Sequence, residues 1–318
     1  MARFWVDPWD PAYLDGADGG DSPPESGSVD PDVEIPAAAW APVPWPADLR
    51  APDTVLLVDG VRRTDARVWT QEPDGGSYPG LAVSYAAGVV RCDLRRGEAA
   101  LAGPPAVERR LVTASPTAAD LVLGPVRYEV YRVTAGELSQ LPGAVQSPLT
   151  RLEAGVATAV REGGADPGDL LVVDGPLRGR SELPRAVGYV KSHQRRYLPP
   201  ELDAVVAALG AGQRSPVFRL DTHWRCYSWY VRLPGGSGAP WSGLARLECS
   251  ANLTPHGAVA LADLSLVTLP RFAATAYKDP RAPQNLIPIA GLEQRLRARL
   301  GDARLLHRAL TRAAAATR

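Results

Sequence analysis

The stretches VLLVDG at positions 55–60 and LLVVDG at positions 170–175 decide the fold class of this 318-residue chain. Each combines a run of apolar residues, typical of a strand buried on both faces, with an Asp-Gly pair that indicates a turn. Leucines and valines recur at helical spacing over 148–162, and a Gly-Gly pair follows them. The order strand, helix, strand predicts an α/β fold.

The rest of the chain extends this pattern. Segments 66–71 and 81–94 are predicted to be extended and to pair with the first strand as a meander, and 186–190 is a third buried strand. A helix is expected over 200–209. Leucines at i, i+4 spacing before Gly301 indicate a helix, and an Arg/Ala-rich helix is expected after it. Further strands are predicted at 218–220, 226–233 and 244–250. We therefore expect a mixed central sheet flanked by helices.

Residues 1–50 differ in composition from the remainder. They hold ten acidic residues and two basic ones, and 15–50 is rich in Gly, Pro, Ser and Asp. We interpret 1–50 as an acidic N-terminal arm, in which 15–50 is extended and partly disordered, and 51–318 as the folded domain. The folded domain then has 33 basic against 25 acidic residues, a net charge of +8. This excess favours a polyanionic partner, although a merely solvated basic surface would have the same composition.

Several classes of protein are disfavoured by the sequence. No apolar run approaches the roughly 18 residues of a membrane helix, and the N-terminus lacks the pattern of a signal peptide. The three cysteines are widely spaced, which disfavours a disulfide framework or a zinc site. No phosphate-binding loop, serine-hydrolase elbow or HExxH motif is present. We expect a cytoplasmic protein that does not bind ATP.

Asp59 and Asp174 are the first candidate site residues, because each follows a buried strand. Carboxylates brought together at strand ends repel each other unless a cation lies between them, and oxygen ligands suit Mg²⁺ or Mn²⁺. The competing interpretation is that Asp-Gly only makes a turn. Glu153 would add a third carboxylate from the preceding helix; by itself it is better explained as a solvated helix residue.

Basic residues follow the second Asp-Gly pair. Lys191, one of two lysines against 33 arginines, comes directly after the strand 186–190. A lysine there offers a compact charge suited to a phosphate group. With the arginines around it, Lys191 predicts a surface for a nucleic-acid backbone, unless these residues form only a solvated loop. The candidates for nucleic-acid binding are Arg178, Arg180, Lys191, Arg195 and Arg196.

The ordered set of motifs resembles the NurA family of DNA end-processing nucleases, from about residue 55 to about residue 310. The motifs are LLVDG (56–60), the helix with Glu153, LLVVDGPL (170–177), GYVKS (188–192), SWYVRL (228–233), GLARLE (243–248) and DPRAPQNL (279–286). The resemblance implies an RNase H-like (Piwi-like) core in a homodimer. It implies exonuclease and single-strand endonuclease activity with two Mn²⁺ (or Mg²⁺) ions, for DNA end resection in recombinational repair, and a HerA-type hexameric ATPase as partner. By position, it makes Asp59, Glu153 and Asp174 metal ligands and Lys191 a catalytic residue.

The chain departs from the family near its C-terminus. A tyrosine and a histidine of many relatives fall on Ala282 and Ala290, and this chain offers Gln284 and Asn285 instead. Asn285 is the candidate for a fourth ligand or a supporting position; otherwise water completes the coordination or the metal site is weaker. Two alternatives therefore stay open: a catalytically silent nucleic-acid-binding scaffold of the same fold, and a nuclease that acts on RNA.

Overall fold

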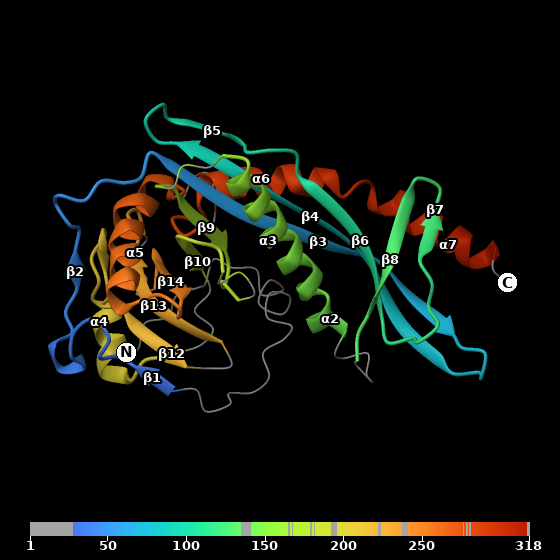
Figure 1. Cartoon of the computed structure of the whole chain (residues 1–318), viewed down its shortest axis with the longest axis horizontal. Coiled ribbons are helices and arrows are strands. Elements are labelled where there is room, and N and C mark those ends of the chain that lie inside the picture. The colour runs from blue at the N-terminus through green and yellow to red at the C-terminus, as the bar shows by residue number, and fades with distance from the viewer. Residues whose placement is uncertain are drawn as a thin grey trace.

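The structure is a computed structural model. It describes residues 28–134, 141–164, 166, 168–178, 180, 182–191, 196–221, 224–236, 241–275, 277, 279 and 281–316. Within these residues a fourteen-stranded mixed sheet forms the centre, and helices lie on both of its faces (Figure 1). This confirms the predicted α/β class with a mixed sheet flanked by helices.

Five strands form the middle of the sheet, in the order β6-β4-β3-β9-β10. Strands β3 (Thr54–Gln71), β4 (Ser77–Asp93) and β6 (Ala106–Thr113) make an antiparallel meander. Strands β9 (Leu170–Asp174) and β10 (Ala186–Val190) run parallel to β3. The parallel strands are apolar on both sides because both faces of this part of the sheet are covered.

Further strands extend the sheet in both directions. Beyond β10 lie β14 (Leu244–Ser250), β13 (Arg225–Arg232), β12 (Phe218–Asp221) and β1 (Ser28–Asp30). Beyond β6 lie β8 (Val126–Arg132) and β7 (Leu121–Leu123). Three short strands pair at the margins: β2 (Val43–Pro44), β5 (Glu98–Leu101) and β11 (Gln213–Arg214).

Alternate residues of β3 pack on opposite faces. Val55 and Leu57 belong to the core cluster that includes helices α5 (Pro255–Thr268) and α6 (Ile287–Arg299). Leu56 and Val58 pack with α3 (Gln146–Glu162) on the other face. Full burial of each such side chain contributes about 1.5–3 kcal/mol, so the unbroken apolar run has a direct energetic reason. The remaining helices are α2 (Leu141–Ala144), α4 (Pro200–Ala207), α7 (Ala303–Ala316), η1 (Ala37–Ala39) and η3 (Leu269–Phe272).

Most of the predicted elements are confirmed, with one error at the first Asp-Gly pair. The strand does not end at Asp59-Gly60; β3 continues to Gln71, because β4 pairs with it along its whole length. The predicted strand 66–71 is the far part of β3. The strand that ends beside Asp59 is β9, the parallel neighbour of β3, which stops at Asp174. Asp59 therefore lies within a strand, beside the point where its neighbour ends.

The predicted arm is in part packed on the sheet. Within residues 28–50, β1 pairs with β12 and β2 pairs with β11. Trp40 is buried, and Glu34 forms a bidentate ion pair with the buried Arg214 at 2.8 Å. Residues 28–50 are thus extended, as expected, but fixed to the core by contacts that composition does not reveal. Residues 1–27 lie outside the described part. No helix of the described residues is long and apolar enough to cross a membrane.

Candidate active site

Asp59 and Asp174 lie side by side. The parallel register pairs Val58 with Val173, so the next residue on each strand is the aspartate. Asp59 is 8% exposed, and its Oδ1 accepts a hydrogen bond of 2.8 Å from the Gly60 amide. After Asp174 the chain turns at Gly175, whose φ of 98° favours glycine. The two carboxylates therefore belong to the face of the sheet that α5 and α6 cover.

Glu153 approaches the same place from α3, on the opposite face. A Cβ atom added to Gly60 would lie 2.6 Å from Glu153 Oε1 and 2.6 Å from Leu149 Cδ1. A side chain at position 60 would therefore displace the end of the Glu153 or the Leu149 side chain. Glu153 is 3% exposed, which excludes its interpretation as a solvated helix residue. The Glu153 carboxylate is close enough to the two aspartates to repel them: besides the larger effect of burial, it raises the pKa of Asp59, and Asp174 raises the pKa of Glu153.

The electrostatics of these carboxylates are unfavourable. Burial raises the pKa of Asp59 well above its ordinary value, and repulsion from Asp174 and Glu153 adds to the effect, against attraction from Lys191. Burial also raises the pKa of Glu153, and the Arg180 guanidinium opposes that shift. The site is therefore rich in negative charge for its degree of burial, and a further cation would stabilise it.

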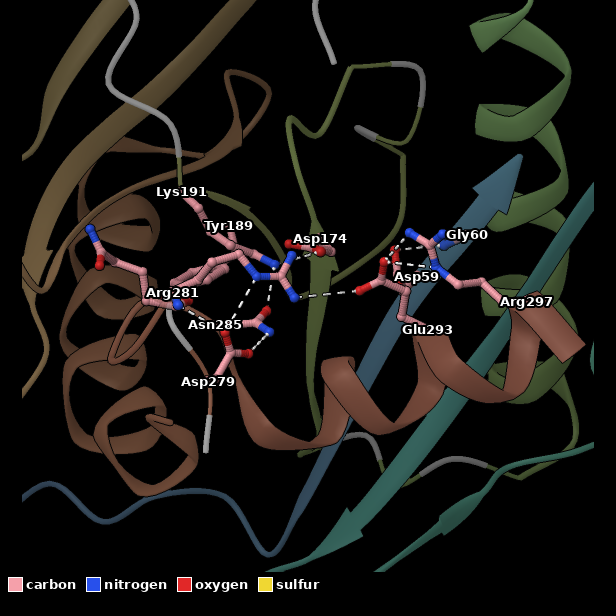
Figure 2. Close-up of polar contacts among 11 residues, drawn as sticks. Asp59, Gly60, Asp174, Tyr189, Lys191, Asp279, Arg281, Asn285, Glu293 and Arg297 are labelled. Carbon is pink, nitrogen blue, oxygen red and sulfur yellow. Dashed lines mark hydrogen bonds and ion pairs between the residues drawn. The ribbon is translucent and has the colours of Figure 1, made fainter. Parts of the chain in front are cut away.

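Lys191 connects Asp174 to the C-terminal part of the chain (Figure 2). Its Nζ donates to Asp174 Oδ2 at 2.7 Å and to Asn285 Oδ1 at 3.1 Å. The Asn285 side chain in turn donates to Asp279. Lys191 is 7% exposed and Asn285 is fully buried. Asn285 is thus connected to Asp174 through Lys191, which donates a hydrogen bond to each of them.

Asn285 was a candidate from the sequence, but the residues that hold Asn285 and its segment in place were missed. Tyr189 donates its hydroxyl hydrogen to the Gln284 carbonyl at 2.7 Å and thereby fixes the segment before Asn285. Asp279 pairs with Arg281 at 3.4 Å, and Arg281 lies 3.8 Å from Glu293 on α6 (Figure 2). The only signal in the sequence was the DPRAPQNL motif as a whole, which contains two of these charges.

The predicted nucleic-acid-binding residues separate into two groups. Arg178 and Arg196 are exposed, and Arg196 lies 4.0 Å from Asp203. Arg180 and Lys191 are buried, and each forms an ion pair with a carboxylate of the site. The remaining candidate, Arg195, lies outside the described residues.

The donor set suits a hard divalent cation, because three carboxylates lie near one another in a buried setting. Within the described chain, however, no three His, Cys, Asp or Glu side chains converge closely enough to hold a metal ion. The contacts explain this: Glu153 is paired with Arg180, and Asp174 is paired with Lys191. Metal binding would require at least Glu153 to exchange its partner.

Comparison with known proteins gives no assignment: no family model and no curated protein matches the chain. The fold and the site define a mixed α/β protein with a buried carboxylate–lysine cluster beside the end of a parallel strand.

Proposed function

We propose that this chain is a metal-dependent DNA nuclease with an RNase H-like core, of the NurA type. One observation carries the proposal: the carboxylates of Asp59, Asp174 and Glu153, from two parallel strands and the preceding helix, lie near enough to repel one another, and Lys191 is bound to Asp174. Perturbed, closely placed ionisable groups are a mark of functional sites.

The sheet order supports the RNase H-like part of the proposal. A three-stranded antiparallel meander is followed by two strands parallel to its first strand, in the order β6-β4-β3-β9-β10. This is the order expected of an RNase H-like core. In chain order, β3 and β9 are the first and fourth of these five strands. Asp59 on β3 lies beside Asp174 on β9, as metal ligands of such a core would.

Each residue has a proposed role. Asp59, Asp174 and Glu153 would hold the cations, Mn²⁺ or Mg²⁺, which when bound activate water and stabilise the leaving oxygen of a phosphodiester. Lys191 orients Asp174 and presents a positive charge to the substrate phosphate, while Asn285 fixes Lys191. The carboxylates serve as ligands and not as the principal base.

Replacing Lys191 with methionine is expected to lower cleavage by about 10- to 100-fold, because residues that orient metal ligands have effects of this size. The measurement is single-turnover cleavage of labelled DNA at saturating Mn²⁺. Arg91→Met, which removes an exposed charge outside the candidate site, serves as control and should act nearly like the wild type. Equal activities for the two variants would contradict the role of Lys191.

The C-terminal helices offer a surface for a polyanion. The outer side of α7 carries three exposed arginines four residues apart, opposite the buried Leu306 and Leu310, and the helix contains no acidic residue. Figure 1 shows α7 following α6 along the sheet. These arginines are Arg304, Arg308 and Arg312.

Changing these three arginines to glutamine is expected to weaken duplex DNA binding and to flatten its salt dependence. Each lost phosphate contact lowers the slope of log affinity against log salt by about 0.9, so the triple variant should lose about 2.7. The matched control changes the exposed Arg50, Arg67 and Arg91. An equal change of slope in the control would show that α7 has no special part in binding.

The resemblance further leads us to propose a homodimer that processes DNA ends with a HerA-type ATPase. The second candidate function is a silent nucleic-acid-binding scaffold, favoured by the engagement of Glu153 and Asp174 with protein cations. To separate them, binding and cleavage are measured on the same labelled DNA and RNA strands with Mn²⁺. A nuclease cleaves what it binds; binding without cleavage of either strand would favour the scaffold, and cleavage of RNA alone would contradict the DNA assignment.

A further inference from the structure

Arg180 projects its side chain into the candidate site from the loop between β9 and β10. Its Nη2 contacts Glu153 Oε2, and its Nη1 donates to the Pro176 carbonyl at 2.6 Å. Both side chains of the ion pair are almost fully buried, with 5% and 4% exposure. Arg178, two residues earlier, is exposed. The loop thus presents one arginine to solvent and directs the other to a carboxylate.

The loop is held in this position by the neighbouring strands. The Leu177 amide donates to Glu248 Oε1 at 2.6 Å, and the Arg180 amide donates to the Leu177 carbonyl at 2.8 Å. Arg246 fixes the other oxygen of Glu248 at 2.7 Å. A Cβ atom at Gly188 would lie only 2.8 Å from the Leu177 nitrogen, so the close packing depends on glycine there. The backbone of Arg180 is therefore anchored even when its side chain moves.

The Arg180 side chain does not use all of its hydrogen-bond donors. The buried Arg180 Nε has no hydrogen-bond partner in the described part of the chain. A buried donor without a partner is costly, so the guanidinium gains by moving to a setting that satisfies all of its donors. A phosphate group, which matches the guanidinium fork with two oxygens, is such a partner.

We propose that Arg180 is an internal counter-ion that competes with the catalytic cation for Glu153. When a divalent cation binds Glu153, the guanidinium leaves the carboxylate; together with Arg178 it then contacts the phosphate backbone of the nucleic acid. The inference rests on the proposed function. The proposed competition explains why the three carboxylates do not converge on one point in the described residues. It also explains why Arg180 is buried although it lies in a basic loop.

The test compares Mn²⁺ binding by the wild type, Arg180→Met and Arg178→Met without DNA, using the electron paramagnetic resonance signal of free Mn²⁺. If Arg180 leaves Glu153 in about one molecule in ten, its removal should tighten Mn²⁺ binding about tenfold. Arg178→Met should bind like the wild type. At saturating Mn²⁺, Arg180→Met should nevertheless cleave more slowly, because a phosphate contact is lost.

A second measurement uses the wild type alone, so that it does not depend on the folding of a variant. Modification of Arg180 by phenylglyoxal, followed by mass spectrometry, should be slow without metal and several times faster with Mn²⁺. Unchanged Mn²⁺ affinity in Arg180→Met, or unchanged labelling of Arg180, would overturn the inference and leave the proposed function in place. Absence of Mn²⁺ binding by both proteins would overturn both.

Discussion

Replacing Asp59 with asparagine is expected to lower cleavage by about 10³-fold and, at the same time, to raise the melting temperature of the metal-free protein. The loss of activity follows because a metal ligand supplies several kcal/mol to the transition state. The gain in stability follows because Asp59 is a buried carboxylate whose pKa burial and neighbouring carboxylates raise. Asparagine removes that charge while it keeps the shape of the side chain.

The sign of this effect follows from proton binding. A raised pKa means that the folded protein binds the proton of Asp59 more tightly than the unfolded chain does. Stability from this group is complete below the unfolded pKa of 3.8 and is lost as the pH rises through the higher folded pKa. The advantage of Asp59→Asn over the wild type should therefore be small in acid and larger at neutral pH, as measured by thermal unfolding with EDTA.

Asp65 provides a matched control on the same strand. It is also buried, but it accepts hydrogen bonds from Arg63 at 2.8 Å, Ser84 at 2.5 Å and Tyr128 at 2.9 Å. Asp65→Asn should lower stability, because it breaks a satisfied network, while cleavage by the folded fraction stays near that of the wild type. Asp59→Asn with normal cleavage, or with a lower melting temperature than the wild type, would contradict the assignment.

Glu34→Ala is expected to destabilise the protein by about 1–3 kcal/mol, because it leaves hydrogen-bond donors of the buried Arg214 unpaired while Asp263 still compensates its charge. Arg214 is 1% exposed, and it also pairs with Asp263 at 2.7 Å. The Val217 amide, which donates to Glu34 at 2.7 Å, loses its partner as well. The effect is measured as the free energy of unfolding in urea.

Asp48→Ala serves as the control for Glu34→Ala, since it removes the same charge from an exposed position of the same segment. Its effect should stay within about 0.5 kcal/mol. Similar, small changes in the free energy of unfolding for both variants would show that residues 28–50 are dispensable for folding. That result would contradict a stabilising role for the packing of this segment on the sheet.

The apolar runs at 55–58 and 170–173 were enough to predict the centre of the sheet, because burial on both faces demands unbroken apolar sequence. The continuation of β3 beyond Asp59 was not predictable in this way. Its later residues alternate in burial, and their pairing with β4 depends on contacts far along the chain. Helix α5 was missed because eight of its residues are buried, which removes the polar stripe that marks a surface helix.

The candidate site was likewise predictable from the sequence only in part. Asp59, Asp174 and Lys191 could be selected because each follows a run of apolar residues. Glu153 depended on the family resemblance, because its packing against Gly60 joins residues far apart in the sequence. The burial of Arg180 could not be read from its basic neighbours, because its loop is held by a hydrogen bond from Leu177 to Glu248, 71 residues away, and its side chain pairs with Glu153.

The most direct test of the central claim is the metal dependence of cleavage. Purified protein is incubated with end-labelled single- and double-stranded DNA in Mn²⁺, Mg²⁺ or EDTA, with Asp174→Asn alongside. We expect cleavage by the wild type with Mn²⁺ or Mg²⁺, none in EDTA, and at most about a thousandth of the wild-type rate for the variant. Cleavage that persists in EDTA or in Asp174→Asn, or its absence with both metals, would contradict the account.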